Sequence, residues 1–284
     1  MKIVFFGFGE NGEKCLTRII KDKIKVLMVI TAPGYENAKI KLIARKSKIP
    51  VLNYTPLSID YVIKKLKTVK AELLVVASFP HLLPKELINS SKYGTINVHA
   101  SLLPAYRGLH PLNWAIIKNE KYVGVTVHYM TETMDAGDIL AQKSILVTDK
   151  DDVNSLKKKI ISLGSKLLLK VISLIAKEGG RIKGNPQNPC LVSFAPKRYP
   201  SDGKISFNSK SRDVFNLVRA LAPPYPMAYA YGNEGQKVEF EKAYIGKRTG
   251  EILAKIRDYY LISVSDGVVF LKTKAKLKIG DILR

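Results

Sequence analysis

The chain has 284 residues, of which 46% are hydrophobic, and its formal net charge at pH 7 is +23. This composition excludes a disordered chain, and no apolar run approaches the roughly 20 residues of a membrane span. The chain opens on a core strand rather than a signal peptide, and its two cysteines, Cys15 and Cys190, indicate neither a disulfide framework nor a metal cluster. We therefore expect a globular cytoplasmic protein with reduced thiols, no membrane partner and no metal.

The first half of the chain alternates short apolar or β-branched runs with helical stretches. Strands are predicted at residues 2–7, 25–31, 49–53, 72–78 and 94–101. Two further strands, at 123–130 and 138–147, and a long amphipathic helix at 152–178 complete this pattern. Strands that alternate with helices predict an α/β fold with a doubly wound, Rossmann-like and mostly parallel sheet.

The segment "GGRIKGNPQNP" (179–189) is rich in Gly, Pro and Asn and ends the alternating pattern. After it come a predicted helix at 211–222 and predicted strands at 227–232, 237–246, 258–265 and 267–273. We therefore expect a first domain at residues 1–180, a linker at 181–200, and a small C-terminal domain at 201–284. This last domain is expected to be a helix followed by strands, either OB-like or truncated.

The large positive charge has two interpretations, a polyanionic partner such as RNA or a lysine-rich background. Lysine is spread along helical stretches such as "DYVIKKLKTVK" (60–70), where it alternates with Leu and Ile at helical spacing. Because only clustered charge makes a nucleic-acid footprint specific, this spread favours the background.

Three glycines, Gly7, Gly9 and Gly12, form G-x-G-x-x-G directly after the first predicted strand. In dinucleotide-binding proteins this turn faces a pyrophosphate, and an acidic residue about 20 residues on holds the ribose. Here the next strand ends in Thr31, Ala32 and Pro33, with no carboxylate. A tight strand-to-helix turn that needs small residues is therefore favoured over NAD or FAD binding.

All four histidines fall between residues 81 and 128, and the strand "GTINVHAS" carries Asn97 and His99 two residues apart, on one side of the strand. In an open parallel sheet, ligands bind beyond the carboxyl ends of the strands. An amide there could donate to an oxyanion, and an imidazole could move a proton. Asp135, on the turn "MDAGD", is the candidate carboxylate. By themselves these residues leave catalysis and a structural histidine both open.

The longer string "NVHASLLPAYRG" (97–108), followed by "MDAGDI" (134–139), resembles the signature of formyltransferases that use 10-formyltetrahydrofolate. Further similarity lies in "SFPHLLPKELI" (78–88) and in "VFNLVRALAPPYPMAYAY" (214–231), so the resemblance covers roughly residues 1–235. It implies catalysis by Asn97, His99 and Asp135 without a covalent enzyme intermediate. The formyl carbon passes from folate N10 to an amine through a tetrahedral intermediate.

The resemblance also implies a folate site for the co-substrate. Its residues are His81, Leu82, Leu83, Ser101, Leu102, Leu103, Pro104, Thr131, Glu132, Thr133, Met134 and Asp135.

Five residues are candidates for binding the acceptor substrate, and each has a structural alternative. Phe8 and Gly9 lie on the first glycine turn, where a helix N-terminus can face a phosphate. Arg107 is an anion contact or a loop salt bridge, and His110 and Trp114 shape the acceptor pocket or pack locally. His128 is interpreted as strand packing.

The acceptor amine is the least determined part of the prediction. Methionyl-tRNA enzymes of the family read "YRGAAPI" and carry a long basic loop after the second strand, whereas this chain reads "YRGLHPLNW" and the corresponding segment is short. This resembles the sugar formyltransferases, so we expect a nucleotide-linked amino sugar as acceptor and a homodimer. Methionyl-tRNA is the alternative, and a non-catalytic nucleotide or RNA binder is the alternative from another class.

Overall fold

The computed structural model describes the chain except for residues 35–37, 233–234, 247–254, 257–258 and 278–284. The described residues group into two compact units. The first unit comprises residues 1–108, 124–145 and 158–194. The second comprises residues 109–123, 146–157 and 195–284.

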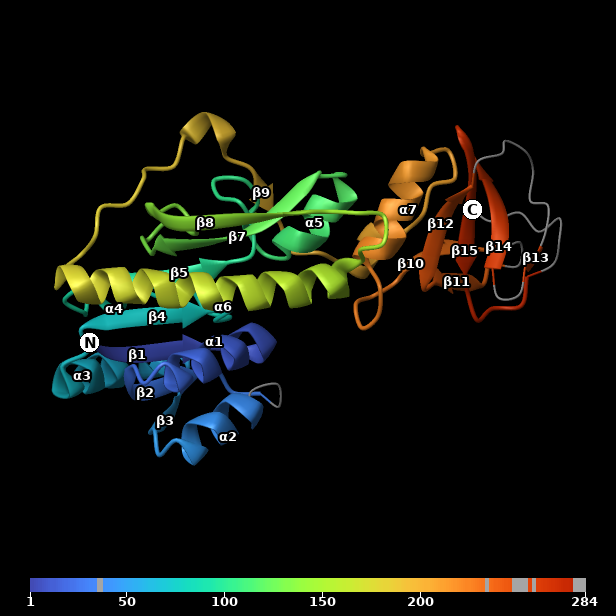
Figure 1. Ribbon diagram of the computed structural model, residues 1–284. Helices are drawn as coiled ribbons and strands as arrows, with labels where there is room; N and C mark the ends of the chain where they lie inside the picture. The colour runs from blue at the N-terminus through green and yellow to red at the C-terminus, as the bar shows by residue number, and fades with distance from the viewer. Residues whose placement is uncertain (35–37, 233–234, 247–254, 257–258, 278–284) are drawn as a thin grey trace. The chain divides into compact units, whose positions relative to one another are not determined.

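The first unit is built on a seven-stranded sheet in the order β3-β2-β1-β4-β5-β7-β8 (Figure 1). Its strands are β1 (Lys2–Gly7), β2 (Lys25–Thr31), β3 (Val51–Asn53), β4 (Leu73–Ala77), β5 (Thr95–His99), β7 (Tyr122–Tyr129) and β8 (Ile139–Leu146). The strands from β3 to β5 are parallel, and β7 pairs with β5 in the antiparallel direction. The prediction of a doubly wound, mostly parallel sheet with a smaller strand-rich C-terminal part is confirmed.

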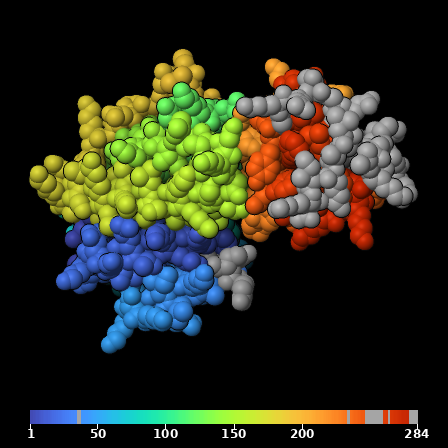
Figure 2. Space-filling model, turned by 45° about the vertical axis from the view of Figure 1, so that its right-hand side comes forward, coloured from blue at the N-terminus to red at the C-terminus, as the bar shows by residue number. Residues whose placement is uncertain are grey.

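Helices cover both faces of this sheet. They are α1 (Gly9–Lys21), α2 (Ala38–Lys46), α3 (Ile59–Val69), α4 (Lys85–Ile88) and α6 (Val153–Glu178). Figures 1 and 2 show α6 beside the N-terminal region that contains α1. Gly164 lets α6 approach the sheet closely, because a Cβ there would lie 3.0 Å from Val125 Cγ2 and 3.1 Å from Val98 Cγ1. On the other face, alternate residues of β1, β2 and β4 pack with α3 and α4 in one buried cluster.

Close packing and turn geometry explain the glycines in the turn between β1 and α1. A Cβ on Gly12 would lie 2.9 Å from Ile40 Cδ1 and 3.1 Å from the Gly7 carbonyl carbon. Gly9 has a φ of +56°, a left-handed conformation that favours glycine. At the end of β2 the Thr31 hydroxyl donates to the Gly7 carbonyl at 2.8 Å. These contacts account for the small residues by backbone approach and turn geometry.

The second unit contains α5 (Pro111–Ile117), α7 (Ser211–Ala220) and the hairpin β10 (Ala228–Tyr231) and β11 (Lys237–Phe240). It also contains a four-stranded sheet, whose strands in order are β12 (Lys242–Gly246), β15 (Gly267–Lys272), β14 (Tyr259–Val264) and β13 (Lys255–Ile256). The single strand expected at 237–246 is wrong. It is interrupted at Glu241, since β11 pairs with β10 whereas β12 pairs with β15. The domain boundaries at 180 and 200 and the OB-like description stay predictions.

Two short strands, β6 (Arg107–Gly108) and β9 (Phe194–Ala195), form a small separate sheet. The Arg107 N–H donates to the Ser193 carbonyl at 2.9 Å, which ties the loop after β5 to the segment after residue 179. Among the described residues, no helix combines the length and apolar character needed to cross a membrane.

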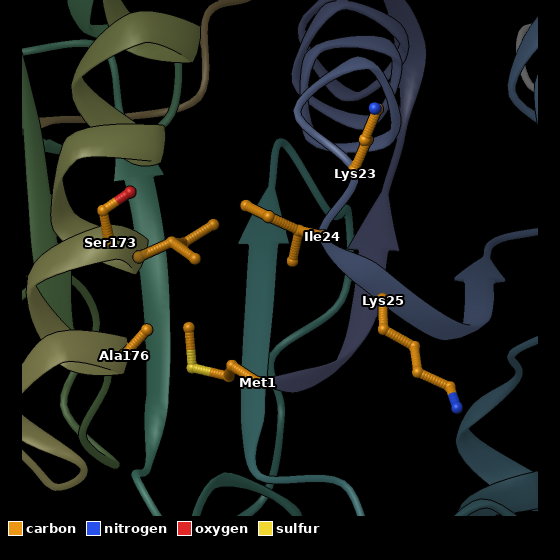
Figure 3. Close-up of a pocket in the computed structure, with 7 residues that line it drawn as sticks. Met1, Lys23, Ile24, Lys25, Ser173 and Ala176 are labelled. Atoms are coloured by element: carbon orange, nitrogen blue, oxygen red, sulfur yellow. The ribbon is translucent and has the colours of Figure 1, made fainter.

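A cavity of about 260 Å³ lies at the amino ends of the strands, lined by Met1, residues 23–25 and one side of α6. Figure 3 shows the side chains of Met1, Ile24 and Ala176 directed toward this space, while those of Lys23 and Lys25 extend away from it. Because β1 and β2 begin here, the cavity is at the edge opposite to the carboxyl ends where ligands of such sheets bind.

Candidate active site

The structure brings the three predicted catalytic residues together at the carboxyl end of β5. Asn97 and His99 lie on β5, and Asp135 lies in the loop after β7. Asn97 Nδ2 is 3.4 Å from Asp135 Oδ1, and His99 Nδ1 is 3.5 Å from Asp135 Oδ2. The His99 and Asp135 side chains are 8% and 11% exposed. This prediction of proximity, made from strand spacing and family resemblance, agrees with the geometry.

His99 is held in one orientation by the backbone. Its Nε2 lies 2.9 Å from the Tyr106 carbonyl oxygen, and because a carbonyl only accepts, Nε2 carries the proton. Nδ1 therefore presents a lone pair in the neutral imidazole, next to the Asp135 carboxylate. Burial lowers the pKa of His99, and the charge of Asp135 and the bond to Tyr106 oppose this shift in part. His99 is thus neutral near pH 7, with an ionised carboxylate ready to stabilise a proton on Nδ1.

His128, interpreted as strand packing, is buried on β7 and also belongs to this cluster. Its side chain is 1% exposed, and its Nε2 lies 3.3 Å from Asn97 Nδ2 and 3.5 Å from Asp135 Oδ1. Its Nδ1 donates to the Tyr129 carbonyl oxygen at 2.7 Å. The antiparallel register of β5 and β7 sets Asn97 directly opposite His128. The crowding of four histidines was the available signal, but the direction of β7 could not be deduced from its own residues.

The Asp135 carboxylate has a polar environment that keeps it ionised. Burial alone would raise the pKa of Asp135, but the hydrogen bond with His128, the charges of His99 and His128 and the Gly108 N–H together lower it to about 2. The Gly108 N–H donates to Oδ2 at 2.9 Å. The carboxylate therefore remains charged throughout the pH range in which imidazoles titrate.

The loop that carries Asp135 is fixed by backbone contacts. Asp135 has a φ of +52°, and a Cβ on Gly137 would lie 2.0 Å from the Tyr129 carbonyl oxygen, so only glycine fits there. Gln187 Nε2 donates to the carbonyl oxygens of Asp135 and Gly137, each at 2.8 Å. Gln187 was assigned to the linker on composition, and its role as a brace for this loop was missed.

Arg107 completes this brace. Its Nε and Nη2 donate to Gln187 Oε1 at 3.1 and 2.7 Å. The partner is a neutral amide, so this bond is not a salt bridge, and a role of Arg107 in binding an anion stays a prediction. Arg107 acts on the Asp135 loop through Gln187.

Two predicted folate stretches, residues 81–83 and residues 131–134, follow β4 and β7, and an ion pair links the segments that contain them. Lys85 Nζ, at the start of α4, lies 2.8 Å from Glu132 Oε1. His81 packs against the rings of Tyr54 and Phe79, Leu83 is buried and Leu82 is 74% exposed. The side chains of residues 131–134 are exposed, and Thr131 donates to the Thr133 carbonyl at 3.0 Å.

The third predicted folate stretch, residues 101–104, is a turn held by Thr126 on β7. The Thr126 hydroxyl donates to the Ser101 carbonyl at 2.7 Å and accepts from the Leu103 N–H at 3.2 Å. The Ser101 hydroxyl donates to the Ala105 carbonyl at 2.7 Å. Leu102 lies against Gly124, and Leu103 precedes Pro104 through a cis peptide bond. The folate role of this turn stays a prediction.

The candidate acceptor residues fall in both units. Phe8 and Gly9 lie at the start of α1, where the Phe8 N–H donates to the Ala77 carbonyl at 3.2 Å. His110 and Trp114 belong to the second unit, and Trp114 Nε1 donates to the Pro196 carbonyl at 2.9 Å. Their binding roles stay predictions.

His99, His128 and Asp135 do not make a metal centre. Within the described part of the chain, no group of three or more His, Cys, Asp or Glu side chains could hold a metal ion. Cys15 is buried, which raises the pKa of its thiol to about 12, and Cys190 is exposed on its own.

Comparison with known proteins identifies the class of this molecule. A family model described as formyl transferase matches residues 1–172, and one described as formyl transferase, C-terminal domain, matches residues 198–282. The chain therefore belongs to the formyl transferase family and is an enzyme, which removes the alternative of a non-catalytic binding protein.

Individual relatives cover nearly the whole chain. A methionyl-tRNA formyltransferase of Thermodesulfovibrio yellowstonii is 33% identical over 276 residues, 94% of this chain and 88% of the relative. One of Streptococcus agalactiae is 35% identical over 298 residues, 99% of this chain and 94% of the relative. Among solved structures, the sugar 3N-formyl transferase WlaRD, determined with dTDP and 5-N-formyl-THF, superimposes with a TM-score of 0.76 at 20% identity, over 98% of this chain and 99% of that one.

Proposed function

We propose that this enzyme transfers the formyl group of 10-formyltetrahydrofolate to the amino group of methionyl-tRNA. The buried cluster of Asn97, His99, His128 and Asp135 carries the first part of this proposal, because it combines an amide donor, a neutral imidazole and an ionised carboxylate at one point. The family resemblance of the surrounding loops and the folate analogue bound by WlaRD support the choice of donor.

The reaction moves one carbon and one proton. The acceptor nitrogen bonds to the formyl carbon, and the carbonyl electron pair moves to oxygen, which gives a tetrahedral oxyanion. The bond from that carbon to folate N10 then breaks, the acceptor nitrogen loses a proton and N10 gains one. The enzyme must therefore stabilise an oxyanion and shuttle a proton, without a nucleophile of its own.

Asn97 is the proposed oxyanion donor. Its two amide hydrogens are directed to Asp135 Oδ1 at 3.4 Å and His128 Nε2 at 3.3 Å. Both distances are long for N–H donors, so an oxyanion at a shorter distance would be a stronger acceptor than either partner is at its present distance. Donors of this kind contribute about 3 kcal/mol to the transition state.

His99 and Asp135 are the proposed proton-handling pair. A proton accepted on His99 Nδ1 would lie beside Asp135 Oδ2, 3.5 Å away, and turn a neutral imidazole and a carboxylate into an ion pair. Because the carboxylate is already ionised, the site needs no reorganisation to stabilise that proton.

The acceptor is assigned from the rest of the chain. The tRNA enzymes resemble it over nearly its full length at 33–35% identity, including the C-terminal part. Within the second unit, one face of the β12-β15-β14 sheet carries Lys242, Lys272 and Tyr259 in one cross-strand row, and Tyr244, Phe270 and Leu261 in the next. Lysines interleaved with aromatic rings suit a nucleic acid, through phosphate charge and base stacking.

A nucleotide-linked amino sugar is the second candidate acceptor, and one observation favours it. Only residues 32–37 separate the end of β2 from the start of α2, where tRNA enzymes of the family carry a long basic loop. A sugar diphosphate would not need that loop. The sequence "YRGLHPLNW" supports the same alternative. The homodimer and the cytoplasmic location stay predictions.

Formylation of methionyl initiator tRNA with 10-formyltetrahydrofolate tests the proposal, with dTDP-, UDP- and GDP-amino sugars assayed beside it. We expect the tRNA to react efficiently and its KM to rise steeply as salt increases from about 50 to about 200 mM, because phosphate contacts release counterions. An inert tRNA beside a reactive sugar would transfer the proposal to the sugar. Failure with every amine would contradict the roles of Asn97, His99 and Asp135.

A further inference from the structure

Arg198, in the second unit, has buried hydrogen-bond donors without partners. Its Nε and Nη1 atoms are buried and make no hydrogen bond to any described residue. Asp202 is near enough for its charge to raise the pKa of Arg198, although burial lowers it more. The Asp202 carboxylate accepts the Tyr199 N–H at 2.6 Å and forms no ion pair with Arg198 among the described residues. A buried cationic donor without an acceptor destabilises a fold, so this arrangement needs an explanation.

The segment that carries Arg198 is fixed in place beside α5. The Leu109 N–H donates to the Ala195 carbonyl at 2.7 Å, and Trp114 Nε1 donates to the Pro196 carbonyl at 2.9 Å. Arg198 therefore follows two residues whose carbonyls are anchored. Its Nε and Nη1 are unpaired although the backbone just before Arg198 is held.

The surroundings of Arg198 are electropositive. Burial lowers the pKa of His110, and the charges of Arg198 and Lys197 lower it further. The guanidinium, the ammonium and the imidazole are thus close enough to influence one another, and the imidazole stays neutral near pH 7. Such a group of donors suits an anion, since a neutral imidazole donates one N–H and the two cations supply charge.

We propose that Arg198, with Lys197 and His110, binds a phosphate group of the acceptor substrate. This inference rests on the proposed function and adds to it the anchor of the acceptor. A guanidinium binds phosphate oxygens through charge-assisted hydrogen bonds, and phosphate oxygens are the kind of acceptor that Nε and Nη1 lack. Both candidate acceptors carry this chemistry, the tRNA in its phosphodiester backbone and the nucleotide sugar in its diphosphate.

This role predicts an unusual combination of effects for Arg198→Met. A structural arginine would be paired in the fold, and its loss would lower the melting temperature. Because Nε and Nη1 of Arg198 are buried and unpaired, Arg198→Met should leave the melting temperature unchanged or raise it, while it weakens phosphate binding. Lys150→Ala is the matched control, because it removes one exposed positive charge from the same unit.

Trp114 is the only tryptophan of the chain and so reports on this region by fluorescence. The full-length protein is titrated with inorganic pyrophosphate, and binding is followed by Trp114 emission and by calorimetry. We expect saturable binding to the wild type and to Lys150→Ala, binding about 10- to 100-fold weaker to Arg198→Met, and an intermediate value for Arg198→Lys. Absence of binding to the wild type by both methods, or equal binding to Arg198→Met, would overturn the proposal.

Steady-state kinetics then distinguish the source of the phosphate. Arg198→Met should raise the KM of the true acceptor about 10- to 100-fold, with kcat and the KM of folate little changed. This rise in KM should be seen with methionyl-tRNA if the tRNA is the substrate, and with the nucleotide sugar if the sugar is. A rise in the KM of folate instead would overturn the proposal, because the phosphate site would then serve the donor. If the tRNA proves inert, the pyrophosphate titration still decides the role of Arg198 by itself.

Discussion

The polar groups around Asp135 and those around Arg198 are satisfied in opposite ways. In the Asp135 cluster each carboxylate oxygen has a partner, and His99 and His128 each donate to a backbone carbonyl. Around Arg198, Nε and Nη1 have no acceptor among the described residues, although the neighbouring backbone is anchored. The first region is complete without a ligand, and the second is not.

This difference separates two uses of buried polar groups. A satisfied network fixes the direction of each donor and proton before substrate arrives, which is the condition for electrostatic catalysis. An unsatisfied donor has a free energy cost that a ligand removes, which is the condition for selective binding. Substitutions in the Asp135 cluster should therefore change kcat, whereas substitutions around Arg198 should change KM.

The largest expected effect is on the catalytic pair. His99→Ala and Asp135→Asn should each lower kcat by about 10³-fold, because the proton loses its acceptor or that acceptor loses its counter-charge. Folate affinity, measured by calorimetry with 5-formyltetrahydrofolate, should stay within a few fold of wild type. A matching loss of folate affinity would mean that these residues bind rather than catalyse.

Substitution of Asn97 should also lower kcat, by somewhat less than substitution of His99 or Asp135. Asn97→Ala removes the proposed oxyanion donor and should lower kcat by about 10²- to 10³-fold. His128→Ala, which removes only the neighbour of that amide, should lower kcat by about tenfold, and His128→Asn by less. Single-turnover rates measure both losses. An Asn97→Ala enzyme that reacts like the wild type would contradict the oxyanion role.

Gln187 tests whether the brace positions the catalytic loop. Gln187→Ala should lower kcat a few fold, because Asp135 and Gly137 each lose a backbone hydrogen bond and the loop loosens. Gln187→Glu keeps the contact to Arg107 but cannot donate to the two carbonyls, so it should not restore the rate. Asn188→Ala, next in the chain and outside this contact, is the control. Equal values of kcat for all the variants would contradict the role of Gln187 in positioning the Asp135 loop.

The smallest effect is a shift in the pH profile. The pKa of His99 is lowered by burial, so His99 should stay neutral to a pH below the ordinary 6.5, and kcat/KM should fall only as pH drops through that lowered value. The groups facing His99 are the Asp135 carboxylate, the His128 imidazole and the Tyr106 carbonyl. In Asp135→Asn the carboxylate that raises this pKa is gone, so the remaining activity should decline at a still lower pH. If kcat/KM of this variant declined at the same acidic pH as that of the wild type, the coupling of His99 to Asp135 would be contradicted.

The sequence predicted those parts of the molecule that depend on local pattern. The parallel strands followed from apolar runs between helices, and Asn97 with His99 followed from their two-residue spacing on one strand. The turn "MDAGD" offered Asp135, 36 residues after His99, as the candidate carboxylate, and the family signature supported that choice. What was missed depends on pairing between distant segments.

His128 joins the cluster only because β7 runs antiparallel to β5 in one particular register. Gln187 and Arg198 lie in segments whose composition indicates a linker. The contacts of Gln187 are with residues 50 to 80 positions away, and the proposed role of Arg198 arises from Nε and Nη1, which have no partner among the described residues. The interruption between β11 and β12 at Glu241 was missed for the same reason. The residue pattern of a strand does not show which other strands its two halves pair with.

The most direct test of the account is a competition between the two acceptors in one reaction. Methionyl initiator tRNA and a panel of nucleotide-linked 3- and 4-amino sugars are supplied together with 10-formyltetrahydrofolate, and the ratio of kcat/KM values is measured for the wild type, Asp135→Asn and Arg198→Met. We predict that the tRNA is formylated in preference, that Asp135→Asn lowers kcat about 10³-fold with every acceptor, and that Arg198→Met reduces kcat/KM through KM. Preferred formylation of a sugar would contradict the proposed acceptor, and full turnover by Asp135→Asn would contradict the proposed chemistry.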